Sequence, residues 1–264
     1  MKKVLVNGAC GRMGQEVVKL LARTEDLELV AATDKVDVGE DIHQILGLSE
    51  PTVKIESDLE VAIEDKSIDV IVDFTTPQVV IENIKLGMQA GIDMVVGTTG
   101  ITEVDIEKIE ELAKANDTNI IIAPNFAIGA ILMMEFSKIA AKYLNQVEII
   151  ELHHDQKLDA PSGTAIKTAE LINQIRDNEE NDLDVIEKIP GARGGEEEGL
   201  NIHSVRLPGL VAHQEVIFGG EGQTLKIRHD SINRRSFMPG VKLAIDKLEE
   251  IDGVVYGLDN LMEF

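Results

Sequence analysis

Short, uninterrupted apolar runs alternate with helical patterns over the first half of the chain. The apolar runs lie at 4–6, 27–33, 68–72, 94–96 and 119–123, and the first helical pattern covers 15–23. Continuous runs of this kind are typical of parallel strands covered on both faces, because crossover helices connect them. We therefore expect an α/β fold in which residues 1–126 form a Rossmann-like, doubly wound parallel sheet.

The pattern changes after Pro124. Two helices are predicted at 129–144 and 162–176, and strands at 147–152, 200–207, 212–218 and 224–229. Because the last three strands follow one another without helices, we expect a C-terminal α+β domain over 127–239 with a mixed or antiparallel sheet. The segment 177–199 is rich in acidic residues, Asn and Gly and predicts a solvated loop. A C-terminal helix is predicted within 240–264, and it can pack back on the first domain.

Charge and composition exclude several classes of partner. The chain has 25 Lys and Arg against 48 Asp and Glu, a formal charge of -23, which opposes binding to nucleic acids and anionic membranes. Cys10 is the single cysteine, so an internal disulfide and a Cys-rich metal site are excluded. The N-terminal apolar run is too short for a signal peptide or a membrane span. We expect a cytoplasmic protein with neither nucleic-acid nor membrane partners.

A glycine-rich turn follows the first predicted strand and opens a helix. The turn contains Gly8, Gly11 and Gly14, with Arg12 and Met13 between the last two glycines. Backbone N–H groups and the positive end of a helix dipole suit a pyrophosphate at such a turn. The spacing is GxxGxxG rather than GxGxxG, and a purely structural strand-to-helix turn also uses glycine. The turn therefore needs a second feature to indicate a dinucleotide site.

Asp34 provides that second feature. It ends the second predicted strand, where a carboxylate accepts hydrogen bonds from the adenosine ribose of NADH. The neighbouring Lys35 suits the 2'-phosphate of NADPH instead. The sequence thus predicts a nicotinamide dinucleotide and leaves both NADH and NADPH open.

Three further strand ends carry turns of small and hydroxyl residues. In open α/β sheets ligands bind outside the carboxyl ends of strands, so we expect these turns to approach the cofactor. The candidate residues are Phe74 in the first turn, Gly97, Thr98 and Thr99 in the second, and Ala123, Pro124, Asn125 and Phe126 in the third.

The densest group of chemically active residues lies at 151–165. His153, His154 and Lys157 concentrate protonatable groups in an acidic chain, and His153 or Lys157 suits proton transfer to a substrate that accepts hydride. We expect no metal here, because neither an H-E-x-x-H spacing nor cysteine ligands accompany the histidines.

The start of the following helix offers a place for a carboxylate. Ser162, Gly163 and Thr164 would present hydroxyl and N–H groups there, although Ser162 also suits ordinary N-capping. Further basic residues occur in this half of the chain, and for each a structural or surface role is favoured. They are His203, His213, His229, Arg206, Arg228, Arg234 and Arg235.

Together these segments resemble the dihydrodipicolinate reductase family over nearly the whole chain. The most specific part is 151–165, which is similar to the family signature of two His, two variable residues, Lys, one further residue, and Asp-Ala-Pro-Ser-Gly-Thr-Ala. The resemblance implies NAD(P)H-dependent reduction of the cyclic imine formed from 4-hydroxy-tetrahydrodipicolinate, a small dicarboxylate, and a homotetramer formed through the second domain.

The resemblance also implies roles for individual residues. His153 would be the proton donor or acceptor and Lys157 the second catalytic residue. His154, Gly163, Thr164 and Arg234 would contact the substrate. Asp and Gln stand at 155 and 156, where some members carry basic residues.

Two other functions share some of these features. A related two-domain dehydrogenase acting on aspartate or homoserine would also have the glycine turn and the acidic ribose residue. A non-catalytic dinucleotide-binding regulator would have them too. The His-His-x-x-Lys and Ser-Gly-Thr cluster argues against both.

Overall fold

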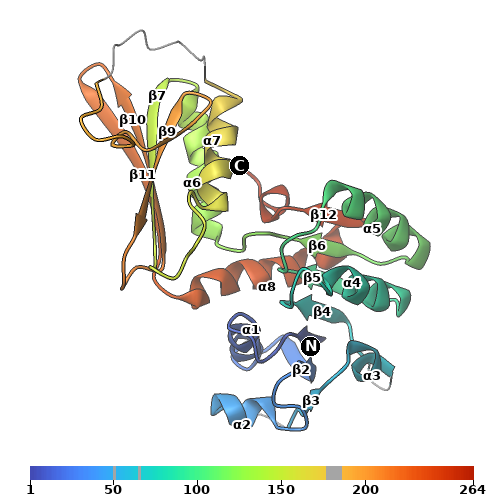
Figure 1. The fold of residues 1–264 in the computed structure, drawn as a ribbon. Helices are drawn as coiled ribbons and strands as arrows, with labels where there is room; N and C mark the ends of the chain where they lie inside the picture. The colour runs from blue at the N-terminus through green and yellow to red at the C-terminus, as the bar shows by residue number, and fades with distance from the viewer. Residues whose placement is uncertain (50–51, 65–66, 177–185) are drawn as a thin grey trace. The chain divides into compact units, whose positions relative to one another are not determined.

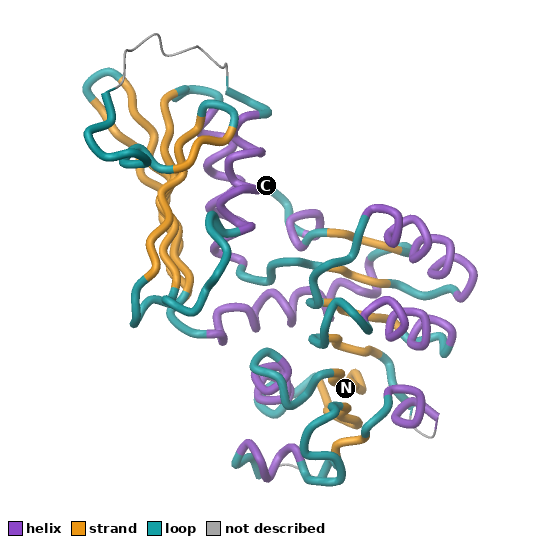
Figure 2. The backbone as a smooth tube through the Cα atoms, in the orientation of Figure 1, coloured by secondary structure: helices purple, strands orange, loops and turns teal. Residues whose placement is uncertain are grey.

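Internal contacts divide the chain into two units with different architectures (Figures 1 and 2). The computed structural model describes residues 1–49, 52–64, 67–176 and 186–264. The first unit consists of Met1–Phe126 and Phe237–Glu263, and the second of Ala127–Ser236 with the terminal Phe264.

The first unit contains a seven-stranded parallel sheet in the order β12-β6-β5-β4-β1-β2-β3. Its central strands are buried along most of their length, as their continuous apolar runs predict. The strands are β1 (Lys2–Asn7), β2 (Leu27–Thr33), β3 (Ile55–Glu56), β4 (Val70–Asp73), β5 (Asp93–Val96), β6 (Ile120–Ile122) and β12 (Val254–Tyr256).

Helices cover both faces of this sheet, which confirms the predicted doubly wound fold (Figure 1). One face packs on α3, α4 and α5, and α1 packs beside α8 on the other. The spacing of Val80, Ile84 and Met88 places one apolar stripe of α4 against the sheet, where all three are fully buried. The helices are α1 (Gly14–Leu21), α2 (Ile42–Leu46), α3 (Leu59–Glu64), α4 (Val80–Gln89), α5 (Glu103–Asn116) and α8 (Met238–Lys247).

The second unit contains a five-stranded sheet in the order β11-β10-β7-β9-β8. Strands β7 and β9 are parallel and the other pairs antiparallel, so the sheet is mixed, which is the first of the two predicted forms. Helices α6 (Ile128–Ala141) and α7 (Gly163–Asn173) lie on one face of it. The strands are β7 (Gln146–His153), β8 (Gly195–Glu197), β9 (Leu200–Arg206), β10 (Ala212–Gly220) and β11 (Gln223–Ser231).

The structure differs from the sequence-based expectation at the C-terminus. The segment 240–264 is not one helix, because α8 ends at Lys247 and the chain continues into strand β12 beside β6. Gly253, with a φ of +80°, turns the chain, and the β-branched pair Val254 and Val255 extends the sheet. Residues Phe237–Glu263 belong to the first unit, so the main part of the second unit ends at Ser236 rather than at 239.

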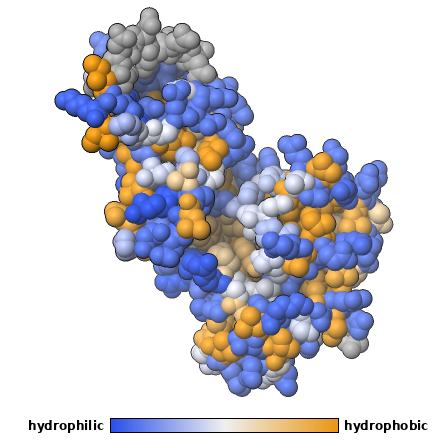
Figure 3. All heavy atoms as spheres, in the orientation of Figure 1, coloured by the Kyte–Doolittle hydropathy of each residue, from blue (hydrophilic) through white to orange (hydrophobic). Residues whose placement is uncertain are grey.

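The expected loop at 177–199 also contains regular structure. Strand β8 pairs with β9 there, and residues 177–185 lie outside the described part of the chain. Hydrophilic side chains occupy much of the visible face of each unit (Figure 3). Among the described residues, no helix has the length and apolar character needed to span a membrane.

Candidate active site

The glycine turn between β1 and α1 is closely packed against neighbouring backbone. A Cβ atom at Gly8 would lie 2.5 Å from the carbonyl oxygen of Phe74, and one at Gly14 would lie 2.0 Å from that of Gly8. Gly8 also has a φ of +82°. Met13 occupies the N-cap position of α1 without a side-chain hydrogen bond, and Arg12 beside it is exposed. The turn therefore fits a pyrophosphate, which would bind the uncapped helix end.

Asp34 holds this turn to the end of β2. Its Oδ2 accepts a hydrogen bond of 2.8 Å from the Cys10 N–H, and its Oδ1 accepts from the N–H groups of Lys35 at 2.7 Å and Val36 at 3.1 Å. Each carboxylate oxygen has two lone pairs, so Asp34 keeps acceptor capacity for a ribose hydroxyl.

Lys35 is already paired in the structure. Its Nζ donates to the Ser57 carbonyl and to Asp58 Oδ1, both at 2.7 Å. The hydrogen bonds from Lys35 and then Ser57 lower the pKa of the Asp58 carboxyl. The positive charge of Lys35, which the sequence predicts as a possible partner of a 2'-phosphate, is thus partly neutralised by Asp58.

A buried carboxylate joins several strand ends of the first sheet. Asp73 is fully buried and accepts hydrogen bonds from the side chains of Asn7, Thr75, Asn83 and Thr98, at 2.7 to 2.8 Å. A fifth hydrogen bond comes from the Thr75 N–H at 3.1 Å. Thr98, predicted as a cofactor contact, is therefore buried and helps to hold the loops after β4 and β5 through Asp73. The sequence did not indicate this structural role.

Phe74 connects the three predicted turns. A Cβ at Gly97 would lie 2.1 Å from Cε1 of Phe74, so only glycine leaves room for this ring. The rings of Phe74 and Phe126 are 5.7 Å apart between centroids. Of the remaining candidates, Thr99 and Pro124 are exposed, Asn125 is half-buried and Ala123 is buried.

A cavity of about 660 Å³ lies beside this loop cluster within the first unit. Five of the predicted cofactor residues line it, namely Gly8, Gly11, Asp34, Lys35 and Phe74. Its wall also includes Asp37, Asp58 and Glu60, which the sequence analysis did not single out. The cavity is therefore acidic on the side of the expected ribose.

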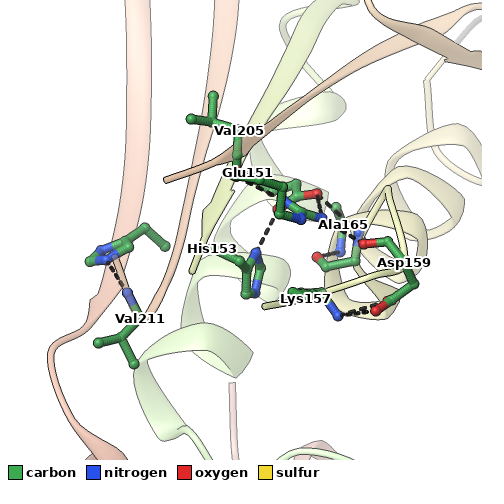
Figure 4. A network of polar contacts seen from close by, with 10 residues as sticks. Glu151, His153, Lys157, Asp159, Ala165, Val205 and Val211 are labelled. Atoms are coloured by element: carbon green, nitrogen blue, oxygen red, sulfur yellow. Dashed lines mark hydrogen bonds and ion pairs between the residues drawn. The ribbon is translucent and has the colours of Figure 1, made fainter. Parts of the chain in front are cut away.

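In the second unit, the end of β7 brings His153 against a buried carboxylate (Figure 4). Glu151 Oε2 lies 2.5 Å from His153 Nδ1, and Arg206 binds both oxygens of Glu151 at 2.7 and 2.8 Å. Burial raises the pKa of Glu151, but hydrogen bonds from His153, Arg206 and Ser204 outweigh it and bring the pKa down to about 2. Glu151 is therefore an ionised group at neutral pH.

Lys157 lies in the loop that follows β7. Its Nζ donates to both oxygens of Asp159, at 2.8 and 2.7 Å, and this pairing lowers the pKa of the Asp159 carboxyl. Nearby in the chain, Nδ1 of His154 is buried and has no hydrogen-bond partner among the residues that the structure describes. A buried polar atom left unpaired is costly, which makes His154 a candidate for a ligand contact.

The start of α7 matches the predicted capping arrangement. Ser162 is buried, and its Oγ accepts from the Ala165 N–H at 3.2 Å, while its own N–H donates to Glu151 Oε1 at 3.2 Å. The N–H groups of Gly163 and Thr164 have no acceptor inside the helix, because the first turn of a helix lacks preceding carbonyls. Gly163 is exposed, and a Cβ there would meet no atom within 4 Å.

Other basic residues of the second unit fall into separate places. Arg234 begins a 3-10 helix at Arg234–Phe237 and is exposed. Within the described residues, it makes no side-chain hydrogen bond to His153. His203 pairs with Glu148 at 2.9 Å, and His213 with Asp230 at 2.6 Å. Among the described residues, no group of three or more His, Cys, Asp or Glu side chains is arranged to hold a metal ion.

Sequence reasoning missed the roles of Glu151 and Arg206. Arg206 was expected to be structural or at the surface, yet it binds the carboxylate that contacts His153. One signal was present, because Val147, Ile149, Glu151 and His153 alternate along β7 and so share one face of the strand. An acid in the buried register of such a strand calls for a cationic partner.

Comparison with known proteins agrees with both units. The family description "Dihydrodipicolinate reductase, N-terminus" matches residues 2–126, and "Dihydrodipicolinate reductase, C-terminus" matches residues 129–262. A 4-hydroxy-tetrahydrodipicolinate reductase of Bacillus cereus is 52% identical over 99% of this chain and 98% of its own length.

Solved structures give the same result. The dipicolinate-bound dihydrodipicolinate reductase from Paenisporosarcina sp. TG-14 aligns with a TM-score of 0.88 and 46% identity, over 99% of this chain and 100% of that one. An amine dehydrogenase from Mycobacterium smegmatis shares only the fold, with a TM-score of 0.69 and 14% identity over 99% of this chain and 96% of that one. The chain belongs to the dihydrodipicolinate reductase family.

Proposed function

We propose that this chain catalyses the NAD(P)H-dependent reduction of 4-hydroxy-tetrahydrodipicolinate, through its dehydrated cyclic imine, to tetrahydrodipicolinate in the diaminopimelate route to lysine. The similarity to reductases of this name runs through both units. The observation that carries the proposal is the cluster at the end of β7, where ionised Glu151 contacts His153 and the following loop supplies Lys157.

The first unit binds the dinucleotide in this proposal. Gly8, Gly11 and the uncapped start of α1 hold the pyrophosphate, and Asp34 accepts from the adenosine ribose. When bound, the reduced nicotinamide supplies hydride to the substrate. NADH is the preferred form, because Asp34, Asp37, Asp58 and Glu60 surround the cavity with negative charge and Lys35 is paired with Asp58.

The second unit binds and protonates the dicarboxylate. The ammonium of Lys157, the imidazole of His154 and the N–H groups of Gly163 and Thr164 supply donors for carboxylates. Arg234 adds a further cation from the 3-10 helix Arg234–Phe237. His153 exchanges the proton with the atom that gains negative charge as hydride arrives, and Lys157 assists it.

Assembly and location follow from other features of the chain. The face of the second sheet opposite α6 and α7 carries the half-buried apolar side chains Ile150, Leu152, Val205 and Ile217, which supports a homotetramer formed through this sheet. We assign the chain to the cytoplasm, where its single, unpaired Cys10 is kept reduced.

The test is the oxidation of NADH and NADPH by the purified protein, with substrate generated in place from pyruvate and aspartate semialdehyde by the upstream synthase. Oxidation that requires both precursors and the synthase supports the proposed reaction. A folded protein that binds NADH but does not oxidise it under these conditions would refute the function. The ratio of kcat/KM for the two cofactors tests the preference for NADH separately.

A further inference from the structure

Glu151 stands at the centre of a hydrogen-bond network that the reaction itself does not require. Its carboxylate is fully buried, and donors of His153, Ser162, Ser204 and Arg206 reach it from three segments of the second unit. Oε1 receives the Ser162 N–H at 3.2 Å and Arg206 Nη2 at 2.7 Å. Oε2 receives Arg206 Nη1 at 2.8 Å and lies 2.5 Å from His153 Nδ1.

The ionisation state of Glu151 determines which ring nitrogen of neutral His153 carries the hydrogen. The bidentate guanidinium of Arg206 compensates the buried negative charge, so Glu151 stays ionised. An ionised carboxylate is an acceptor only, and therefore the short contact requires a hydrogen on Nδ1 of His153. In the neutral imidazole the second nitrogen, Nε2, then carries the lone pair.

We propose that Glu151, held in place by Arg206, is a positioning residue that keeps His153 in its Nδ1-protonated tautomer and thereby assigns proton exchange with the substrate to Nε2. This inference rests on the proposed function, in which His153 is the proton-transfer group. Neither Glu151 nor Arg206 contacts the substrate in it.

The same pair of residues also connects the other parts of the cluster. Arg206 Nη2 donates to the backbone carbonyl of Asp159 at 2.7 Å, and Asp159 in turn holds Lys157. The Ser162 N–H reaches Glu151 from the start of α7. One buried ion pair thus aligns the strand that carries His153, the loop that carries Lys157 and the helix end proposed to bind a carboxylate.

The variant Glu151→Gln has a defined effect on this network. Two donors with fixed hydrogens, the Ser162 N–H and Arg206 Nη2, meet the Oε1 position, against one, Arg206 Nη1, at the Oε2 position. The amide oxygen therefore takes the place of Oε1, and the amide NH2 takes the place of Oε2, where the hydrogen bond from Nη1 is lost. The NH2 group then faces His153 Nδ1 as a donor. His153 must accept this hydrogen bond, and its own hydrogen moves to Nε2.

The tautomer is measured by nitrogen–proton correlation NMR on protein labelled with 15N-histidine, above the titration of the imidazoles. Two histidines serve as references in the same spectrum: His213 donates from Nδ1 to Asp230 while its Nε2 accepts from the Val211 N–H, and His203 contacts Glu148 through Nε2. We expect the His153 signals of the wild-type protein to follow the His213 pattern and to change to the opposite tautomer in Glu151→Gln. A His153 that carries its hydrogen on Nε2 in the wild-type protein overturns the proposal, and this measurement does not depend on how well the variant folds.

Kinetics test the consequence for catalysis. Glu151→Gln is expected to lower kcat by about 10²-fold or more while the Kd for NADH stays within about twofold, and Glu151→Asp to recover part of the loss because it keeps a carboxylate. The matched control is Glu170→Gln, which removes an exposed carboxylate that pairs with Lys167 on α7. A kcat of folded Glu151→Gln within about tenfold of wild type would contradict the positioning role. Failure of the wild-type protein to oxidise NADH would instead refute the proposed function, and the tautomer measurement would still decide on Glu151.

Discussion

Lys157 Nζ donates to both carboxylate oxygens of Asp159, at 2.8 and 2.7 Å, so the proposed second catalytic residue is held by an acid two positions away. The Lys157 side chain is only 21% exposed, whereas Asp159 is 64% exposed. A carboxylate with that much access to water is easily displaced from a lysine. A dicarboxylate can therefore take over the ammonium without a large electrostatic cost.

Substitution of Lys157 by Met tests this assignment. The change keeps an unbranched side chain and removes the charge, so we expect kcat/KM to fall by about 10²- to 10⁴-fold with a Kd for NADH that changes less than about twofold. Lys167→Met on the exposed face of α7 is the matched control and should leave kcat/KM unchanged. Equal losses in turnover and NADH affinity for Lys157→Met would place Lys157 in cofactor binding instead.

We expect the charge of Asp58 to influence the preference for NADH or NADPH. In Asp58→Asn the hydrogen-bonding side chain is kept, one negative charge leaves the cavity wall, and the ammonium of Lys35 is no longer neutralised. We expect the ratio of kcat/KM for NADPH over NADH to rise about threefold to fivefold, the scale of one exposed charge pair. The gain should shrink at high salt because exposed charges are screened.

The double variant Asp58→Asn/Lys35→Met provides the control for that gain. Without the ammonium of Lys35, the described residues that line the cavity include no Lys or Arg to meet a 2'-phosphate, and most of the increase should disappear. Steady-state assays of the wild type, of Asp58→Asn and Lys35→Met alone, and of the double variant at two salt concentrations give the comparison. A gain that survives in the double variant would show that Lys35 is not its source.

The glycine turn makes a steric prediction. A Cβ at Gly14 would lie 2.0 Å from the carbonyl oxygen of Gly8, so Gly14→Ala must displace the turn from α1. We expect a loss of about 1 to 3 kcal/mol in stability and at least about tenfold weaker NADH binding. Gly195→Ala is the control, because its Cβ would come no closer than 4.0 Å to another residue. Calorimetric titration with NADH measures both variants, and wild-type affinity in Gly14→Ala would contradict the close packing.

Local patterns predicted the parts of the fold that depend on local sequence. Strand β2 occupies the same residues, 27–33, that its apolar run predicted, and α7 begins directly after the Ser162 cap. Strand β12 has only three residues and exists because the edge of β6 is available to pair with it. An element that short carries too little pattern of its own to be predicted.

The residues of the candidate site also divide into those that the local sequence predicts and those that it does not. The signature at 151–165 identified His153 and Lys157, since their neighbours in the chain define the motif. The partners that set their state are distant in sequence: Arg206 is 55 residues from Glu151 and comes close only because β9 pairs in parallel with β7. Likewise, Asp58 meets Lys35 across 23 residues. Such contacts follow from strand order and register, which a single sequence does not state.

The ionised state of Glu151 also predicts how stability depends on pH. Its pKa in the folded protein is about 2 against an ordinary 4.5, so the folded state favours the carboxylate and gains stability above pH 4.5 that is lost as the pH falls toward 2. The difference corresponds to about 3 kcal/mol at neutral pH. Glu151→Gln should therefore be less stable than wild type by about that amount at pH 7, and more than half of the deficit should vanish by pH 3.

The measurement must report on the second unit alone. Hydrogen exchange of peptides from β7 and β9, followed by mass spectrometry across a urea series, gives the unfolding free energy of that unit at pH 7 and pH 3 for both proteins. Glu170→Gln again serves as control, because its exposed partner Lys167 gives it little influence on stability. A deficit of Glu151→Gln that is the same at both pH values would mean that the loss comes from packing and not from the charge of Glu151.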